Sequence, residues 1–121
     1  MNNVYLFQIP IGIEEKMPVH YPYSSGLLWA YAQQFLEINK KYQLKDIIFL
    51  REDPDQVVAS LENPAVVGFS CYVWNMNYNA VVAEKIKIRF PNCKIIVGGP
   101  HVSSNDTDFF KKIQLLRYCC V

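Results

Sequence analysis

The chain has 121 residues, of which 51% are hydrophobic and 19% are charged, and its formal net charge is +1. This length is enough for one domain with one core, and the composition is typical of a globular protein rather than a disordered one. Because the net charge is close to zero and the basic residues are scattered, neither nucleic acid nor an anionic membrane is expected as a partner.

The chain begins with MNNVYLFQIP, which carries no positive leader. No stretch approaches the roughly 20 apolar residues of a membrane span, so a cytoplasmic protein is expected. Four cysteines show no metal-ligand spacing, namely Cys71, Cys93, Cys119 and Cys120. In an intracellular protein these are expected to be reduced thiols that pack as small apolar groups.

Short apolar runs alternate along the chain with segments that predict helices. The runs predict strands at 3–10, 46–52, 65–73, 93–99 and 115–121. The intervening segments predict helices from Ser24 or Ser25 to about Lys41, from Asp53 to Leu61, over 75–90 and over 106–113. Asp53 is an expected N-cap, with Pro54 at the first helical position.

Two of these helices carry apolar stripes at three- and four-residue steps. The stripe of the first consists of Leu28, Tyr31, Phe35, Ile38 and Tyr42. The stripe of the third consists of Tyr78, Val82, Ile86 and Phe90, and Pro91 ends that helix. Both stripes are expected to pack against a sheet.

The order of elements predicts an α/β fold, a doubly wound five-stranded parallel sheet that forms one domain. The strands are continuous apolar runs, as expected where helices cover both faces of a sheet. Five strands suggest the flavodoxin-like, Rossmann-like order 2-1-3-4-5, in which ligands bind beyond the carboxyl ends of the strands.

Three loops are expected to meet at that edge, at residues 10–23, 70–77 and 98–105. They contain a group of aromatic and soft side chains, namely Tyr21, Tyr23, Tyr72, Trp74 and Met76. Such side chains suit a large planar ligand, although aromatic residues in these positions also pack beneath the following helix. Both interpretations stay open.

Gly98 and Gly99 end the fourth predicted strand. A turn with positive φ explains one glycine. The second glycine also fits a ligand that approaches the backbone closely. The pair alone does not decide between these explanations.

Common catalytic patterns are missing from these loops. No G-x-G-x-x-G or phosphate-binding P-loop follows the first strand. Ser70 stands where a phosphorylatable receiver domain would need an aspartate, and no arginine follows Cys71 to hold a phosphate. Neither His20 nor His101 can be placed in a catalytic triad. The sequence therefore predicts no self-sufficient catalytic apparatus.

Three blocks carry a resemblance to a known family, namely PVHYPYSSGLLWAYA, VVGFSCYVWNMNYNAVVAEKIKIRFPNC and IIVGGPHVSS. Together they resemble the N-terminal cobalamin-binding (B12-binding) domain of B12-dependent radical SAM enzymes, from about Val4 to Phe110. The most specific part is Ser70-Cys71-Tyr72, followed some twenty-five residues later by Gly98-Gly99.

The resemblance implies that the nucleotide tail of cobalamin inserts beside the third and fourth strands while the corrin ring rests over the sheet edge. It implies that Ser70 hydrogen-bonds the tail and that Gly98 and Gly99 make room for it. The residues that would complete the cofactor site are Cys71, Tyr72, Trp74, Pro100 and His101.

The family's better-known members carry Asp-x-His-x-x-Gly after the first strand, with a histidine that binds cobalt. Here the nearest histidine is His20, which lacks this motif and an acidic partner to orient it. We therefore expect cobalamin to bind without a histidine ligand, and we expect no protein metal ligand.

The cysteine motif of a radical SAM module is also missing, which suggests a truncated product, a frame-disrupted product or an excised domain. The expected function is a cobalamin-binding module that is not catalytic by itself and that works with a radical SAM module or partner chain. A flavodoxin-like domain that binds FMN, and a remnant that only binds partners, are the alternatives.

Overall fold

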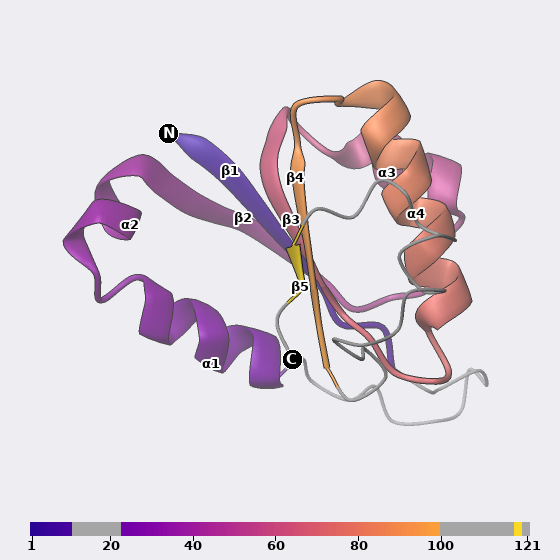
Figure 1. The fold of residues 1–121 in the computed structure, drawn as a ribbon, viewed down its shortest axis with the longest axis horizontal. Coiled ribbons are helices and arrows are strands. Elements are labelled where there is room, and N and C mark those ends of the chain that lie inside the picture. Colours follow the sequence, from indigo (N-terminus) through magenta and orange to yellow (C-terminus); the bar gives the residue numbers. More distant parts are fainter. Residues whose placement is uncertain (11–22, 100–117, 120–121) are drawn as a thin grey trace.

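A computed structural model describes residues 1–10, 23–99 and 118–119 of the chain. One sheet lies between two groups of helices (Figure 1). The strands are β1 (Asn2–Phe7), β2 (Tyr42–Ile48), β3 (Pro64–Ser70), β4 (Lys94–Gly98) and the two-residue β5 (Tyr118–Cys119). The helices are α1 (Tyr23–Ala32), α2 (Leu36–Lys41), α3 (Pro54–Ser60) and α4 (Met76–Arg89).

All strand pairings are parallel. The order runs β2-β1-β3-β4, and β5 pairs with β4 through Ile96–Tyr118 and Val97–Cys119. The predicted α/β class with a parallel sheet is confirmed. The chain leaves β1 for β2 on one side and returns to β3 on the other, so the switch point of the sheet lies between the carboxyl ends of β1 and β3.

The core lies between the sheet and the helices α3 and α4. Odd-numbered side chains of the central strands fill it, namely Tyr5, Phe7, Val67, Phe69, Ile95 and Val97. They meet the predicted stripe of α4, in which Val82 and Ile86 are fully buried. Asp53 caps α3 by accepting a hydrogen bond from the Asp55 amide at 3.3 Å, with Pro54 at the first helical position, as predicted.

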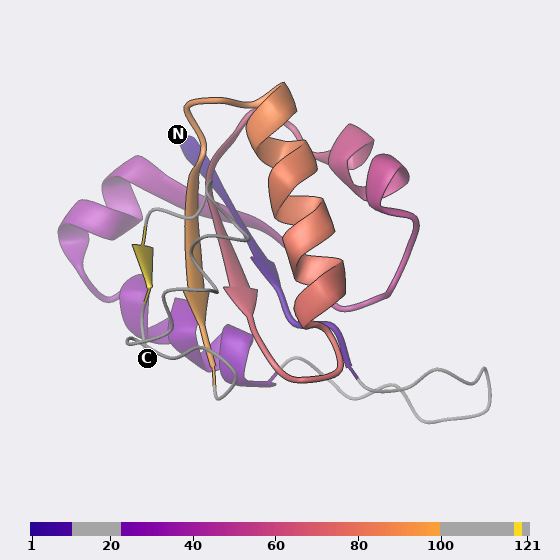
Figure 2. The same ribbon diagram turned by 45° about the vertical axis from the view of Figure 1, so that its right-hand side comes forward.

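The opposite face of the sheet carries the even-numbered side chains and is covered less completely. Figure 2 shows α1 and α2 on this side, across the sheet from α3 and α4. Ile96 on this face is 37% exposed, whereas Ile95 on the core face is fully buried. Helices thus lie on both faces of the sheet, as predicted, but the cover on this face is incomplete, because cavities separate α1 from the strands.

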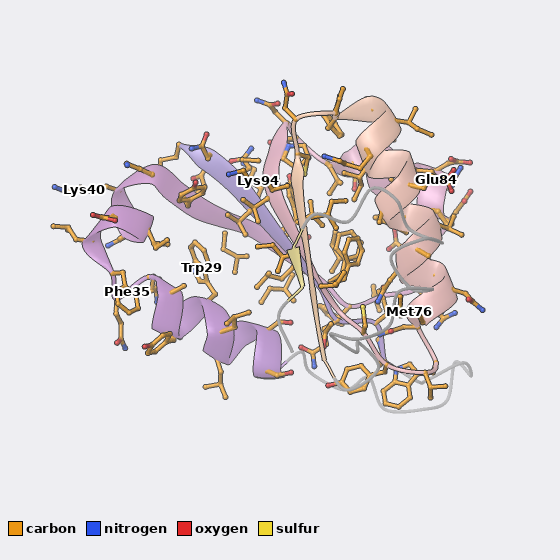
Figure 3. The ribbon with its side chains drawn as sticks, in the orientation of Figure 1. Trp29, Phe35, Lys40, Met76, Glu84 and Lys94 are labelled. Atoms are coloured by element: carbon orange, nitrogen blue, oxygen red, sulfur yellow. The ribbon has the colours of Figure 1, made fainter. Side chains whose placement is uncertain are left out.

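The prediction of a single helix from Ser24 or Ser25 to about Lys41 is wrong. A turn at 33–35 separates α1 from α2, and Phe35 adopts an extended conformation with φ −83° and ψ 124°. The expected stripe is not buried, because Leu28, Tyr31 and Phe35 are 60%, 63% and 51% exposed. Figure 3 shows Phe35 at the outer side of this region, whereas Trp29 extends from α1 toward the sheet.

Several strand boundaries differ from the predictions, and β1 and β2 end at Phe7 and Ile48 rather than at Pro10 and Glu52. The second strand begins at Tyr42 rather than Asp46, because pairing with Asn2 at the start of β1 extends it backwards. The third strand ends at Ser70 rather than 73, where the chain turns so that the Tyr72 amide donates to the Asn75 side chain. The predicted helix at 106–113 lies outside the described residues, as does most of the predicted strand at 115–121.

Two kinds of feature are absent from the described residues. No helix among them has the length and apolar character to cross a membrane. Nor do three or more His, Cys, Asp or Glu side chains gather within these ranges in a way that could hold a metal ion.

Candidate functional site

Two adjoining cavities separate α1 from the even-numbered face of the sheet, with volumes of about 170 and 340 Å³. Both are lined by Leu6, Leu28, Gly68 and Ile96. We call the pair the α1 groove. Its wider part is almost wholly apolar and includes Trp29 and Val66. The groove is therefore suited to a flat, mainly apolar group.

The narrower part of the α1 groove reaches the carboxyl edge of the sheet and includes the polar residues Ser24, Ser25 and Ser70. Gly98 and Gly99 line the same part. The structure thus brings together three residues that the sequence predicted for one site, namely Ser70, Gly98 and Gly99. They meet because β3 and β4 are paired in register, with Ser70 opposite Gly98.

The structure explains why residue 99 is a glycine, a question that the sequence left open. Its φ is +107°, and a Cβ on it would stand 2.6 Å from the carbonyl oxygen of Cys71 and 2.9 Å from its nitrogen. The missing side chain of Gly99 therefore accommodates the protein's own backbone, and its role in making room for a ligand stays a prediction.

Cys71 lies in the core, fully buried among the odd-numbered side chains. Its amide donates to the Gly98 carbonyl at 2.7 Å, which ties the end of β3 to that of β4. The Cys71 side chain thus lies in the core and does not line the groove, and its predicted part in the cofactor site stays a prediction.

Tyr72 and Trp74 form an aromatic pair just beyond β3. Their rings stack with centroids 4.5 Å apart and an interplanar angle of 6°. Trp74 is 39% exposed, and its indole N–H donates to the Ile9 carbonyl at 3.1 Å. Arg51 supports the loop by donating to the Trp74 carbonyl at 2.7 Å. The pair is thus held in place with part of its surface accessible at the sheet edge.

The remaining predicted residues, His20, Pro100 and His101, lie outside the described part of the chain. Three residues that line the α1 groove were not predicted from the sequence, namely Leu6, Gly68 and Ile96. A glycine within a run of β-branched residues was the available signal at Gly68. A Cβ there would lie 2.9 Å from the Leu6 Cδ2, so any side chain at this position would have to displace the end of Leu6.

Comparison with known proteins agrees with this geometry. Residues 27–120 match the B12 binding domain family. The chain belongs to this family. Two methyltransferases match 75% of the chain. The cobalamin-dependent radical SAM methyltransferase TokK of Streptomyces tokunonensis is 36% identical over 91 residues. The 2-(S-pantetheinyl)-carbapenam-3-carboxylate methyltransferase of Streptantibioticus cattleyicolor is 35% identical over 91 residues.

The chain spans 13% of the length of each of these curated relatives. It is a B12-binding domain of the kind found in B12-dependent radical SAM methyltransferases, and its cofactor is cobalamin. The predicted family and cofactor are confirmed, and nothing supports the FMN alternative.

The residues of the α1 groove fit cobalamin. The base of its nucleotide tail is a flat and largely apolar ring, which matches the apolar part of the groove. The tail's polar linker would pass the serines at the narrower end. The lack of a side chain at Gly68 keeps the groove open, since even a single Cβ would press on Leu6.

Proposed function

We propose that the domain holds cobalamin with its nucleotide tail in the α1 groove and its corrin ring over the carboxyl edge of the sheet. The observation that carries this proposal is the side-chain-free floor of the groove at Gly68 and Gly98, between an apolar wall and three serines. A solid core on this face would leave no place for the tail.

Each predicted residue then has a definite part. Ser70 hydrogen-bonds the tail, and Gly98 lets it approach β4. Tyr72 and Trp74 give a flat contact for the corrin, together with Pro100 and His101. No histidine of the protein binds cobalt, and His20 lies at the corrin edge. Cys71 contributes only its backbone, by fixing β3 to β4.

The domain acts with a radical SAM module, on a longer polypeptide or on a partner chain, and is not catalytic alone. Support comes from the curated relatives, which are far longer methyltransferases. When bound, cobalamin supplies methyl-transfer chemistry at cobalt. The contribution of this chain is to bind the cofactor, orient it and exclude water from the tail.

The proposal includes a single domain with a complete, flavodoxin-like fifth strand, whose described part is Tyr118–Cys119 beside β4. It also places the domain in the cytoplasm. Buried cysteines such as Cys71 and Cys93 fit a reducing compartment.

Titration of the purified chain with hydroxocobalamin and, separately, with FMN tests the proposal. A saturable change in the cobalamin absorption spectrum, with no imidazole-ligated form, is expected. His20→Ala should leave that spectrum unchanged. Binding of FMN instead would favour the flavodoxin-like alternative, and binding of neither would leave a fold that serves only protein partners.

A further inference from the structure

Asn75 is a fully buried amide at the switch point of the sheet. It occupies the N-cap position of α4, where an asparagine side chain normally accepts a hydrogen bond from the first turn of its own helix. Asn75 makes no such bond. Its side chain points elsewhere, so α4 lacks the N-cap hydrogen bond that commonly stabilises helices.

The Asn75 amide instead makes four hydrogen bonds, which is the full capacity of the group. Its Nδ2 donates to the carbonyl oxygens of Ile9, at 3.1 Å, and Ser70, at 3.0 Å. Its Oδ1 accepts from the Tyr72 amide at 2.8 Å and from the Asn79 side chain at 3.1 Å. One side chain therefore joins the chain beyond β1, the end of β3 and the loop that carries the aromatic pair.

Asn79, one turn further along α4, reinforces this arrangement. Its Nδ2 also donates to the Ser70 carbonyl, at 3.3 Å, while its buried Oδ1 has no hydrogen-bond partner among the described residues. The Ser70 carbonyl thus accepts from two asparagines. The position of Ser70 is consequently set by α4 as well as by the sheet.

We propose that Asn75 is a positioning residue for cobalamin, with Asn79 as its support. This inference rests on the proposed function. Asn75 acts through Ser70, which faces the tail, and through the Tyr72–Trp74 pair, which faces the corrin. It contacts neither, and its effect on affinity comes from holding both in one geometry before the cofactor arrives.

The test compares Asn75→Ser with Asn77→Ser. Serine is as good an N-cap as asparagine but too short to reach Ile9 and Ser70 together, so it can restore the cap while losing the bridge. Asn77 lies in the same first turn of α4 and is exposed, which makes it a matched control. Two measurements are made on each variant: the affinity for hydroxocobalamin, and the ¹⁹F NMR signal of 5-fluorotryptophan at Trp74, assigned by its loss in Trp74→Phe.

Asn75→Ser should weaken hydroxocobalamin binding by about tenfold or more, the scale of a lost buried hydrogen bond, and should shift the Trp74 signal without ligand. Its melting temperature should fall below that of Asn77→Ser, because buried groups lose their partners, so affinities are compared at a temperature at which both variants are folded. Affinity and signal that both match Asn77→Ser would overturn the proposal.

If Asn75→Ser does not fold, Asn79→Ala decides, because alanine favours the helix while removing the second bond to Ser70. Weaker binding by this folded variant supports the proposal, and unchanged binding overturns it. If the unaltered chain binds no hydroxocobalamin, the proposed function fails. The Trp74 signal then still shows whether Asn75 positions the loop.

Discussion

The backbone of Gly99 lies so close to that of Cys71 that a Cβ on the glycine would stand 2.6 Å from the Cys71 carbonyl oxygen. This contact joins the ends of β3 and β4, where the site and the core meet. It makes Gly99 a requirement of the fold, whatever the site binds.

Gly99→Ala should therefore lower the free energy of unfolding by about 3 kcal/mol, since the new methyl group meets rigid backbone and the φ of +107° disfavours any side chain. Gly26→Ala is the matched control. A Cβ at Gly26 meets nothing within 4 Å, so alanine there should be neutral or stabilise α1 by up to about 1 kcal/mol. Urea denaturation measures both, and equal effects would contradict the assignment.

Gly68→Val should separate binding from stability. Valine suits a strand, and the only close neighbour of its Cβ is the flexible end of Leu6, so the stability should change by no more than about 1 kcal/mol. The same side chain would occupy the α1 groove and should weaken hydroxocobalamin binding by about tenfold or more. Gly26→Val, outside the groove, should bind normally. Retained affinity in Gly68→Val would argue against the groove as the tail site.

Side chains in the core and side chains on the exposed side of α1 should differ sharply in their contribution to the free energy of unfolding. Ile86 is fully buried between α4 and the sheet, so Ile86→Ala should cost about 3 kcal/mol. Tyr31 on α1 is 63% exposed, with Phe35 as its ring neighbour at 5.3 Å, so Tyr31→Ala should cost less than about 1 kcal/mol. A large loss in Tyr31→Ala would mean that the α1 stripe is buried, as the periodicity alone predicts.

Burial raises the pKa of the Cys93 thiol from 9.0 to about 11, with the Lys87 ammonium opposing the shift. The folded state thus favours the protonated thiol. Its contribution to stability is complete below pH 9 and is lost as the pH rises through about 11. Between pH 8 and pH 10.5 the unaltered chain should lose about 1–2 kcal/mol more unfolding free energy than Cys93→Ala. Equal losses would mean that the thiol is solvated.

Local signals in the sequence were sufficient for one half of the fold. Asp53 and Pro54 predict the start of α3, and an apolar stripe followed by Pro91 predicts α4. Both predictions depend only on residues close in sequence, and the structure confirms them. The break between α1 and α2 has no such signal, since neither glycine nor proline marks Gln33–Phe35. The early start of β2 depends on pairing with β1, which local patterns do not reveal.

The proximity of Ser70 and Gly98 could be predicted, because parallel strands bring their carboxyl ends to one edge of the sheet. Leu6, Gly68 and Ile96 were not predicted, because these strands are continuous apolar runs. Such runs do not indicate which face of the sheet packs in the core and which lines a cavity. Asn75 was missed because an asparagine before a helix ordinarily predicts a cap, and only the structure shows its amide directed to β1 and β3.

The alternation along β3 has an evolutionary consequence. Val67 and Phe69 belong to the hydrophobic core, whereas Val66, Gly68 and Ser70 line the α1 groove, so residues of the core and residues of the proposed cofactor site alternate along β3. Point substitutions can change either set separately. Inserting or deleting a single residue in β3 would move the core side chains into the groove and the groove residues into the core. Both the stability of the fold and the proposed cofactor site would then be lost.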